Sequence, residues 1–253
     1  MYVDLKLGDC LLLMNEIEDK SIDMILCDLP YGVTNNCNDK RLPFDKLWKH
    51  YNRIIKDDGI IILFGQGKFY IDLVNSNIKM FRYDLIWNKV LKTGFLNANR
   101  QPLRQHEQLA IFYKKQTKYN PQFTIGKPLH GRGRNFKNNN KINNNYGEFK
   151  VIDDKRKGST EKYPTSILEF KKVHPSMSKH PTEKPIELLE YLIKTYTNKN
   201  DVILDNCMGS GSTGVACIKN SRNFIGIEKC KEYFEIAKER INREYTKQEE
   251  EKW

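Results

Sequence analysis

A strand–turn–helix–strand pattern between residues 202 and 228 constrains the fold of this 253-residue chain more than any other feature. A short apolar run predicts a buried strand, and the turn after it contains Gly209 and Gly211. Glycines there permit positive φ angles and a close approach of backbone to ligand. A helix and a second strand follow, and that strand ends in an acid, Glu228. This βαβ pattern is typical of sites that hold a ribose by its hydroxyls, although a tight turn without ligand is the alternative for this segment alone.

A second strand end carries a different chemistry. The apolar run at residues 21–27 predicts a strand, and Asp28, Leu29, Pro30 and Tyr31 follow it. Because Pro30 fixes φ and lacks an amide donor, backbone carbonyls point outward between a carboxylate and a phenol ring. Such a corner can accept two hydrogen bonds from an exocyclic amino group and stack on the ring that carries it. An ordinary turn with a capping aspartate is the alternative, and the glycine turn in the same chain argues against it.

These two segments resemble the amino-methylating DNA methyltransferases, which use S-adenosylmethionine to modify the exocyclic nitrogen of adenine or cytosine. Further segments resemble the family in the expected order: Gly8–Cys10, Lys162–Phe170, His180–Pro185 and Ile225–Glu228. Because the tetrapeptide at 28–31 precedes the glycine turn, the resemblance is to the circularly permuted beta class. The chain departs from the family pattern at Leu29, where proline is usual, and at residues 206–207, where Pro-Phe is usual.

The resemblance implies an α/β fold, the Rossmann-like S-adenosylmethionine-dependent methyltransferase fold. Its doubly wound, mostly parallel sheet would be circularly permuted and carry a small target-recognition insert. Hydrophobic periodicity agrees, because apolar runs of strand length alternate with apolar residues at helical spacing. We expect four parts: a catalytic half at 1–113, a basic target-recognition insert at 114–175, a cofactor-binding half at 176–246 and a tail at 247–253.

The resemblance also implies site residues. The catalytic corner would be Asp28, Leu29, Pro30 and Tyr31, with the base extruded from the duplex by base flipping. The expected contacts with S-adenosylmethionine are Asp9, Cys10, Asp28, Lys184, Asp205, Asn206, Cys207, Met208, Gly209, Ser210, Gly211, Ser212, Thr213 and Glu228. Among them, Lys184 is a candidate for the methionine carboxylate, with a plain surface lysine as the alternative.

The charge of the chain predicts a polyanionic partner. The formal net charge is +11. Residues 114–172 hold 15 Lys and Arg against 5 Asp and Glu, so that 15 minus 5 leaves +10 in this one segment. A concentrated basic surplus is typical of proteins that bind DNA, whereas a solvated lysine-rich loop is the alternative. The expected DNA contacts are Arg132, Arg134, Lys137 and Lys141.

Other compositional features exclude some classes. There is no apolar run of about 18 residues and no signal segment at the N-terminus, so we expect a cytoplasmic protein that neither spans nor binds a membrane. The cysteines lack metal-ligand spacing, and we expect no metal: Cys10, Cys27, Cys37, Cys207, Cys217 and Cys230. Double-stranded DNA is the expected partner. A homodimer and a cognate restriction nuclease, as in restriction–modification systems, stay open.

The proposed chemistry has alternatives. An acid in the first position of the tetrapeptide usually accompanies adenine in this family, so we expect methylation of adenine N6, with cytosine N4 as the alternative. Methyltransferases acting on RNA or protein commonly have Asn in place of Asp28, which argues against them. A catalytically inactive DNA-binding module is a further alternative, and the intact corner and glycine turn argue against it.

Overall fold

The computed structural model describes residues 1–32, 39–128, 158–172 and 183–250. These divide into a main unit, Met1–Asn120 with Thr165–Trp253, and a smaller unit, Pro121–Pro164. Within its described residues, the smaller unit contains a two-stranded antiparallel ribbon of β6 (Thr124–Ile125) and β7 (Glu161–Lys162). Beside this ribbon, the rings of Phe123 and Tyr163 lie 5.0 Å apart between centroids.

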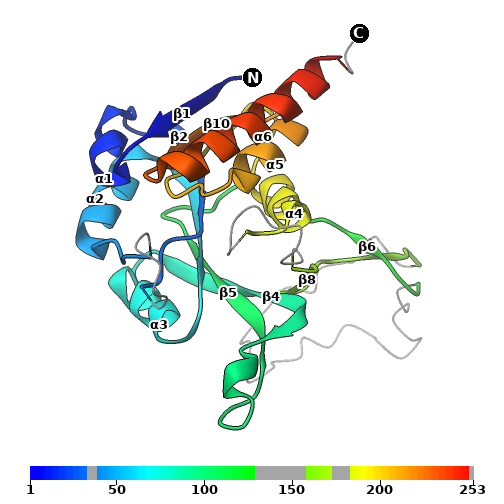
Figure 1. Ribbon diagram of the computed structural model, residues 1–253. Coiled ribbons are helices and arrows are strands. Elements are labelled where there is room, and N and C mark those ends of the chain that lie inside the picture. The colour runs from blue at the N-terminus through cyan, green and yellow to red at the C-terminus, as the bar shows by residue number, and fades with distance from the viewer. Residues whose placement is uncertain (33–38, 129–157, 173–182, 251–253) are drawn as a thin grey trace. The chain divides into compact units, whose positions relative to one another are not determined.

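The main unit is built on a sheet of eight strands among the residues described, in the order β1-β10-β9-β2-β3-β5-β4-β8 (Figure 1). Neighbouring strands from β1 to β3 are parallel, whereas β5 is antiparallel to both β3 and β4. The strands are β1 (Val3–Leu7), β2 (Ile22–Cys27), β3 (Ile55–Gly65), β4 (Phe81–Thr93), β5 (Arg104–Phe112), β8 (Ile167–Glu169), β9 (Val202–Asp205) and β10 (Asn223–Glu228).

Helices cover both faces of this sheet, with the blue and cyan helices on one side and the yellow to red helices on the other (Figure 1). They are α1 (Cys10–Leu13), α2 (Phe44–Ile54) and α3 (Gly67–Ser76) on the first face, and α4 (Ile186–Tyr196), α5 (Ser212–Lys219) and α6 (Lys231–Glu250) on the second. Within the described part of the chain, two short 3-10 turns, η1 (Met14–Glu16) and η2 (Phe95–Asn97), complete the elements.

Strand β3 shows how the sequence builds this three-layer arrangement. Side chains alternate across a strand, so a strand that is buried on both faces needs an unbroken apolar run. Ile60 and Ile62 pack in the core beneath α4–α6, whereas Ile61 and Leu63 pack in the core beneath α1–α3. All four side chains are fully buried. The apolar run therefore places β3 in the interior of the sheet.

The strand order reverses between β9 and β2. From β9 the chain passes through α5 to β10, which lies on one side, whereas from β2 it passes through α2 to β3 on the other side. In open α/β sheets, ligands bind at the carboxyl ends of the strands where the order reverses. Asp205 ends β9 and Asp28 follows β2, so the two predicted motifs meet at this point.

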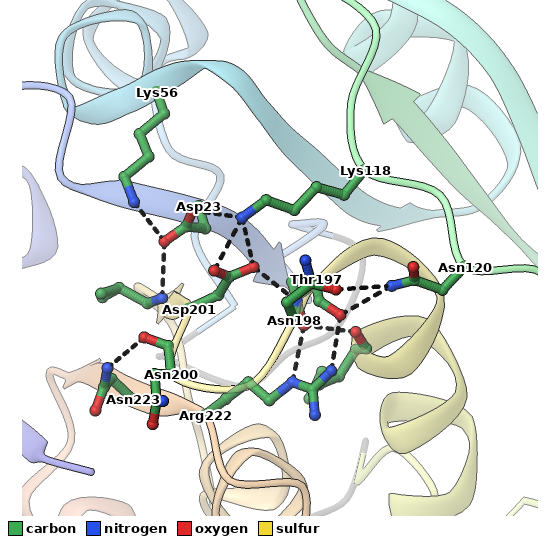
Figure 2. Close-up of polar contacts among 12 residues, drawn as sticks. Asp23, Lys56, Lys118, Asn120, Thr197, Asn198, Asn200, Asp201, Arg222 and Asn223 are labelled. Atoms are coloured by element: carbon green, nitrogen blue, oxygen red, sulfur yellow. Dashed lines mark hydrogen bonds and ion pairs between the residues drawn. The ribbon is translucent and has the colours of Figure 1, made fainter.

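At the opposite, amino-terminal ends of these strands, a polar network ties the main unit together (Figure 2). The Lys118 ammonium binds Asp201 at 2.7 Å and Asp23 at 3.1 Å. Asp23 also accepts hydrogen bonds from Lys56 and from the amide of Val202. Lys118 therefore joins the starts of β2 and β9.

The same network fixes the chain before it enters the smaller unit. The Asn120 side-chain amide donates to the carbonyls of Lys194 and Thr197 and to the side chain of Asn198 (Figure 2). Residues 114–120 are thus held by the main unit. The predicted boundaries of the insert at 114 and 175 stay a prediction, while the division into compact units falls at residues 121 and 164.

The predicted mostly parallel α/β sheet with helices on both faces is confirmed. Three local predictions from the sequence pattern are a strand near residues 83–87, a last helix at about 233–244, and Thr182 as the cap of the helix that begins at Pro185. Strand β4 instead runs from Phe81 to Thr93, because it pairs with β5 along a long hairpin. Helix α6 continues to Glu250. Pro185 occupies the N-cap of α4, and Thr182 lies outside the described residues.

None of the helices among the described residues is long and apolar enough to cross a membrane.

Candidate active site

The corner after β2 holds a carboxylate between two donors. Asp28 Oδ1 accepts a 2.9 Å hydrogen bond from the Tyr31 hydroxyl, and Oδ2 accepts one from the Lys184 ammonium. The Tyr31 ring stacks on Phe69 with centroids 4.5 Å apart and an interplanar angle of 26°. One face of the tyrosine is therefore covered by the protein, and the direction of the carboxylate is set by its two partners.

A buried row of alternating charges continues from Asp28 into the sheet. The Lys184 ammonium lies 3.4 Å from Glu107 Oε2, and Glu107 Oε1 accepts a 2.7 Å hydrogen bond from the Lys89 ammonium. Lys184, Glu107 and Lys89 are each at most 9% exposed. Two positive and two negative groups thus compensate one another, and three of the four are shielded from water, as buried charges require.

The pKa shifts of Lys184 and Glu107 agree with this charge arrangement, whereas burial raises the pKa of Asp28 despite the opposing effect of Lys184. Burial opposes the charge on Lys184, but the carboxylates of Asp28 and Glu107 outweigh it and raise the pKa of the ammonium. Burial likewise opposes the ionised form of Glu107, but Lys184 and Lys89 lower its pKa below the ordinary value. Lys184 and Glu107 are therefore both charged at neutral pH.

The glycine turn after β9 is organised by its first residue, Asp205. Its Oδ1 accepts a 3.1 Å hydrogen bond from the Cys207 amide, and Oδ2 accepts a 2.7 Å bond from the Thr213 hydroxyl at the start of α5. Gly209 and Gly211 take φ angles of 52° and 80°, as the sequence predicted for this turn. Burial raises the pKa of the Asp205 carboxyl to about 6.

Other residues of the turn form hydrogen bonds with neighbouring segments of the protein. Asn206 Oδ1 accepts a 2.6 Å hydrogen bond from the buried Tyr51 hydroxyl. Arg240 of α6 donates to Ser210 Oγ at 2.8 Å, and Ser212 donates to Glu183 at 3.2 Å. The amide of Met208 donates to the Ile227 carbonyl. These contacts fix the conformation of the turn.

The third part of the site lies at the ends of β10 and β1, which pair in parallel up to Leu7 and Glu228. Glu228 accepts hydrogen bonds from the amides of Gly209 at 2.9 Å and Cys230 at 2.7 Å, one on each carboxylate oxygen. Burial raises its pKa. Asp9 Oδ1 caps α1 through the Leu11 amide at 2.9 Å. The pKa of Cys10 is raised mainly by the hydrogen bond between its thiol and that of Cys207, and burial raises it further.

Comparison with known proteins identifies this arrangement. Residues 22–239 match the model of a family described as DNA methylase. This chain belongs to the DNA methylase family. It is 29% identical to the type II methyltransferase M.HpaI of Haemophilus parainfluenzae over 247 residues, which is 92% of this chain and 72% of that protein. It is 26% identical to the DNA adenine methyltransferase YhdJ of Escherichia coli strain K12, over 93% of this chain and 81% of the relative.

The fold of this DNA methylase also resembles a solved structure. The M1.HpyAVI–SAM complex superposes with a TM-score of 0.61 at 23% sequence identity, covering 94% of this chain and 99% of the other. The methyltransferase fold expected from the sequence is therefore present.

The predicted site residues of the methylase fall into three groups. Asp28, Tyr31 and Lys184 are in direct contact with one another or share a partner. The members from Asp205 to Thr213, together with Glu228, Asp9 and Cys10, surround the carboxyl ends of β9, β10 and β1. The expected DNA contacts Arg132, Arg134, Lys137 and Lys141 lie outside the described residues.

Sequence reasoning missed Glu107 and Lys89. A signal existed for Glu107, because it is an acid placed two residues before the apolar run 109–112 of a predicted strand. Such a buried acid needs a partner. No comparable signal marked Lys89, because a lysine near the end of a strand is usually exposed.

Proposed function

We propose that this DNA methylase transfers a methyl group from S-adenosylmethionine to the exocyclic N6 amino group of adenine in double-stranded DNA. The observation that carries the proposal is the position of Asp28. Its carboxylate follows β2, next to the glycine turn after the neighbouring strand β9, at the point where the strand order reverses. A nucleoside cofactor and an acceptor of amino hydrogens thereby share one crevice.

The donor set around the glycine turn suits S-adenosylmethionine. Each oxygen of Glu228 accepts one backbone hydrogen bond and retains a lone pair for a ribose hydroxyl. Gly209, with a φ of 52°, would let the backbone of the turn approach a ligand closely. The proposed cofactor contacts remain those expected from the sequence, and the bound cofactor would supply an electrophilic sulfonium methyl group. Lys184 is a special member of this set, because its ammonium already has Asp28 and Glu107 as partners.

Asp28 and its neighbours would activate the target amino group by orientation. The carboxylate accepts one amino hydrogen, and the carbonyl of Leu29 or Pro30 accepts the other, so that the nitrogen lone pair is directed out of ring conjugation. Tyr31 offers the ring face opposite Phe69 for stacking on the flipped base. The contribution of these residues is positioning and electrostatics, and no protein nucleophile is required.

Adenine is favoured over cytosine by two observations. The first residue of the tetrapeptide is an acid, Asp28, and a relative that matches over 93% of this chain is named a DNA adenine methyltransferase. Methylation of cytosine N4 is the second candidate, since the family resemblance includes both reactions.

The basic segment 114–175 is proposed as the target-recognition insert between the catalytic half at 1–113 and the cofactor-binding half at 176–246. Its support is the charge surplus of +10, from 15 minus 5, in residues 114–172. A cytoplasmic location follows from access to DNA and fits the cysteines of the described residues, which are all free thiols. A homodimer and a cognate nuclease are further proposals that rest on the family resemblance alone.

The test is transfer of a labelled methyl group from S-adenosylmethionine to duplex DNA, to RNA and to protein, followed by nucleoside analysis of the product. We expect N6-methyladenine from DNA alone. The Asp28→Ala variant should lose methyl transfer and leave cofactor binding largely intact. N4-methylcytosine would select the second candidate, and an Asp28→Ala variant with near wild-type turnover would contradict the mechanism.

A further inference from the structure

The carboxylate that the target amino group needs already has a cationic partner. Each oxygen of Asp28 accepts one hydrogen bond, Oδ1 from Tyr31 and Oδ2 from Lys184, and each retains a second acceptor site. The Lys184 ammonium neutralises the carboxylate and so weakens it as an acceptor for an amino group. A buried ammonium cannot leave one acceptor unless another is within reach.

Glu107 provides that second acceptor. Its Oε2 is buried and accepts no hydrogen bond from any residue that the structure describes. It lies 3.4 Å from the Lys184 ammonium, which is beyond a good charge-assisted hydrogen bond but within an ion pair. Oε2 therefore has an ion-pair partner but no hydrogen bond of good geometry, which is uncommon for a buried carboxylate oxygen.

Lys89 holds Glu107 in this position. Its ammonium binds Glu107 Oε1 at 2.7 Å, so the other oxygen is turned toward Lys184. Lys89 is only 3% exposed. The backbone next to it is unfavourable: Val90 is β-branched and has a φ of 64°, and its amide bonds to the Asn88 side chain. Strain of this kind persists only where the surroundings enforce it, and it occurs at functional sites.

We propose that Glu107 and Lys89 are positioning residues that let Lys184 move between two carboxylates during methyl transfer. Before the target base enters, the ammonium neutralises Asp28. When the amino group binds Asp28, the ammonium shifts toward Glu107 Oε2, completes a hydrogen bond there and leaves Asp28 free to act as acceptor. The exchange moves an ammonium group and transfers no proton. The inference rests on the proposed function of Asp28.

The proposal is tested by the single-turnover rate of methyl transfer, since steady-state turnover can be limited by product release. The Glu107→Gln variant removes the negative charge at this position. It should lower the rate about 10- to 100-fold, the loss expected for one charge-assisted hydrogen bond. The dissociation constant of S-adenosylmethionine should change less than the rate does, because the change leaves the glycine turn and Glu228 untouched. Glu107→Asp keeps the charge but shortens its reach, and it should show a smaller loss while retaining the buried ion pair.

A double-mutant cycle separates this role from a merely structural one. In a Lys184→Met background, Glu107→Gln should change the rate less than about threefold, because Glu107 acts through Lys184. The matched control is Glu190→Gln, which alters another glutamate that pairs with lysines, Lys194 and Lys219, and should leave the rate unchanged.

Equal losses from Glu107→Gln in both backgrounds would overturn the inference, as would full activity of both Glu107→Gln and Glu107→Asp. Absence of methyl transfer in the wild-type protein would instead refute the proposed function, so the two failures are distinct.

Discussion

Asp28 and Asp205 show how the surroundings give two carboxylates different properties. Both follow the carboxyl end of a buried parallel strand, β2 or β9. The Asp28 carboxylate has a lysine partner, Lys184, whereas the hydrogen bonds to Asp205 come from neutral groups of Cys207 and Thr213. Burial raises the pKa of both carboxyl groups, and at Asp28 the Lys184 ammonium opposes this rise. The pKa of Asp205 rises from an ordinary value of 3.8 to about 6.

This raised pKa predicts a pH-dependent affinity for the cofactor. A group with a raised folded-state pKa is protonated more readily, so near pH 6 the unliganded Asp205 carboxyl is partly neutral. S-adenosylmethionine is cationic at its sulfonium and amino groups, and its binding should favour the carboxylate and expel a proton. We expect its affinity to fall as the pH drops through about 6.

Calorimetry at pH 6 in two buffers with different ionisation enthalpies measures this proton release. The Asp205→Asn variant, which cannot titrate, should show none from this position. A wild-type binding enthalpy that is independent of the buffer would contradict the prediction.

At the scale of elements, the glycine turn and α6 depend on each other. Gly211 has a φ of 80°, and a Cβ atom added there would lie 2.9 Å from Ala237 Cβ and 3.0 Å from Ala237 Cα on α6. Gly94, before η2, has a similar φ of 86°, but an added Cβ would meet nothing within 4 Å. Comparing substitutions at these two glycines therefore separates the effect of conformational strain from that of steric contact.

Both Gly211→Ala and Gly94→Ala should lower the free energy of unfolding through strain at positive φ. Gly211→Ala should lower it by a further 1–3 kcal/mol or so, because the backbone of α6 must shift. Urea unfolding followed by circular dichroism measures the difference. If the two variants lost the same free energy of unfolding, the contact with α6 would add no steric cost to Gly211→Ala.

At the scale of the molecule, the network at the amino-terminal strand ends holds β2 and β9 side by side, and hence the catalytic corner beside the cofactor turn. Lys118 joins Asp23 and Asp201 in this network (Figure 2). Burial raises the pKa of Asp23, but Lys56, the Val202 amide and Lys118 outweigh it, so the pKa lies below the ordinary value. A depressed carboxyl pKa stabilises the fold above the unfolded-state pKa, and this contribution is lost as the pH falls.

The Lys118→Met variant should therefore lower the free energy of unfolding by about 1–3 kcal/mol at pH 7, because it leaves buried carboxylates with fewer partners. The difference from wild type should shrink as the pH is lowered below about 4, where carboxyl groups become neutral. Denaturant titrations across this pH range test both statements. Lys115→Met is the control, since its ion pair with Asp57 is solvent-exposed and should not measurably affect stability. A constant difference at all pH values would exclude the electrostatic explanation.

The charge distribution over the whole chain predicts how DNA binding responds to salt. Changing Arg132, Arg134, Lys137 and Lys141 together to Ser should flatten the log–log salt dependence of DNA affinity by up to about four units, if each residue neutralises one phosphate. Cofactor affinity should stay the same. An unchanged salt slope, measured by fluorescence anisotropy with a labelled duplex, would show that DNA is bound elsewhere.

The sequence by itself determined the parts of this protein whose signals are local. Apolar runs marked the strands of the parallel sheet, the positions of Gly209 and Gly211 marked a turn with positive φ, and Asp28 to Tyr31 marked an acceptor corner. The ends of the elements were less predictable. Strand β4 extends past residue 87 because pairing with β5 supports it, and this support is invisible in the local pattern.

Only the tertiary structure decided which charges meet. Asp28, Lys89, Glu107 and Lys184 come from four separate segments, and they meet because β2, β3, β5 and β4 are neighbours in that order and the segment before α4 runs beside them. Strand order arises from long-range packing, so no periodicity or spacing along the chain encodes it. The buried row of charges is therefore a property of the folded molecule, and its function depends on the burial that makes each unpaired charge unfavourable.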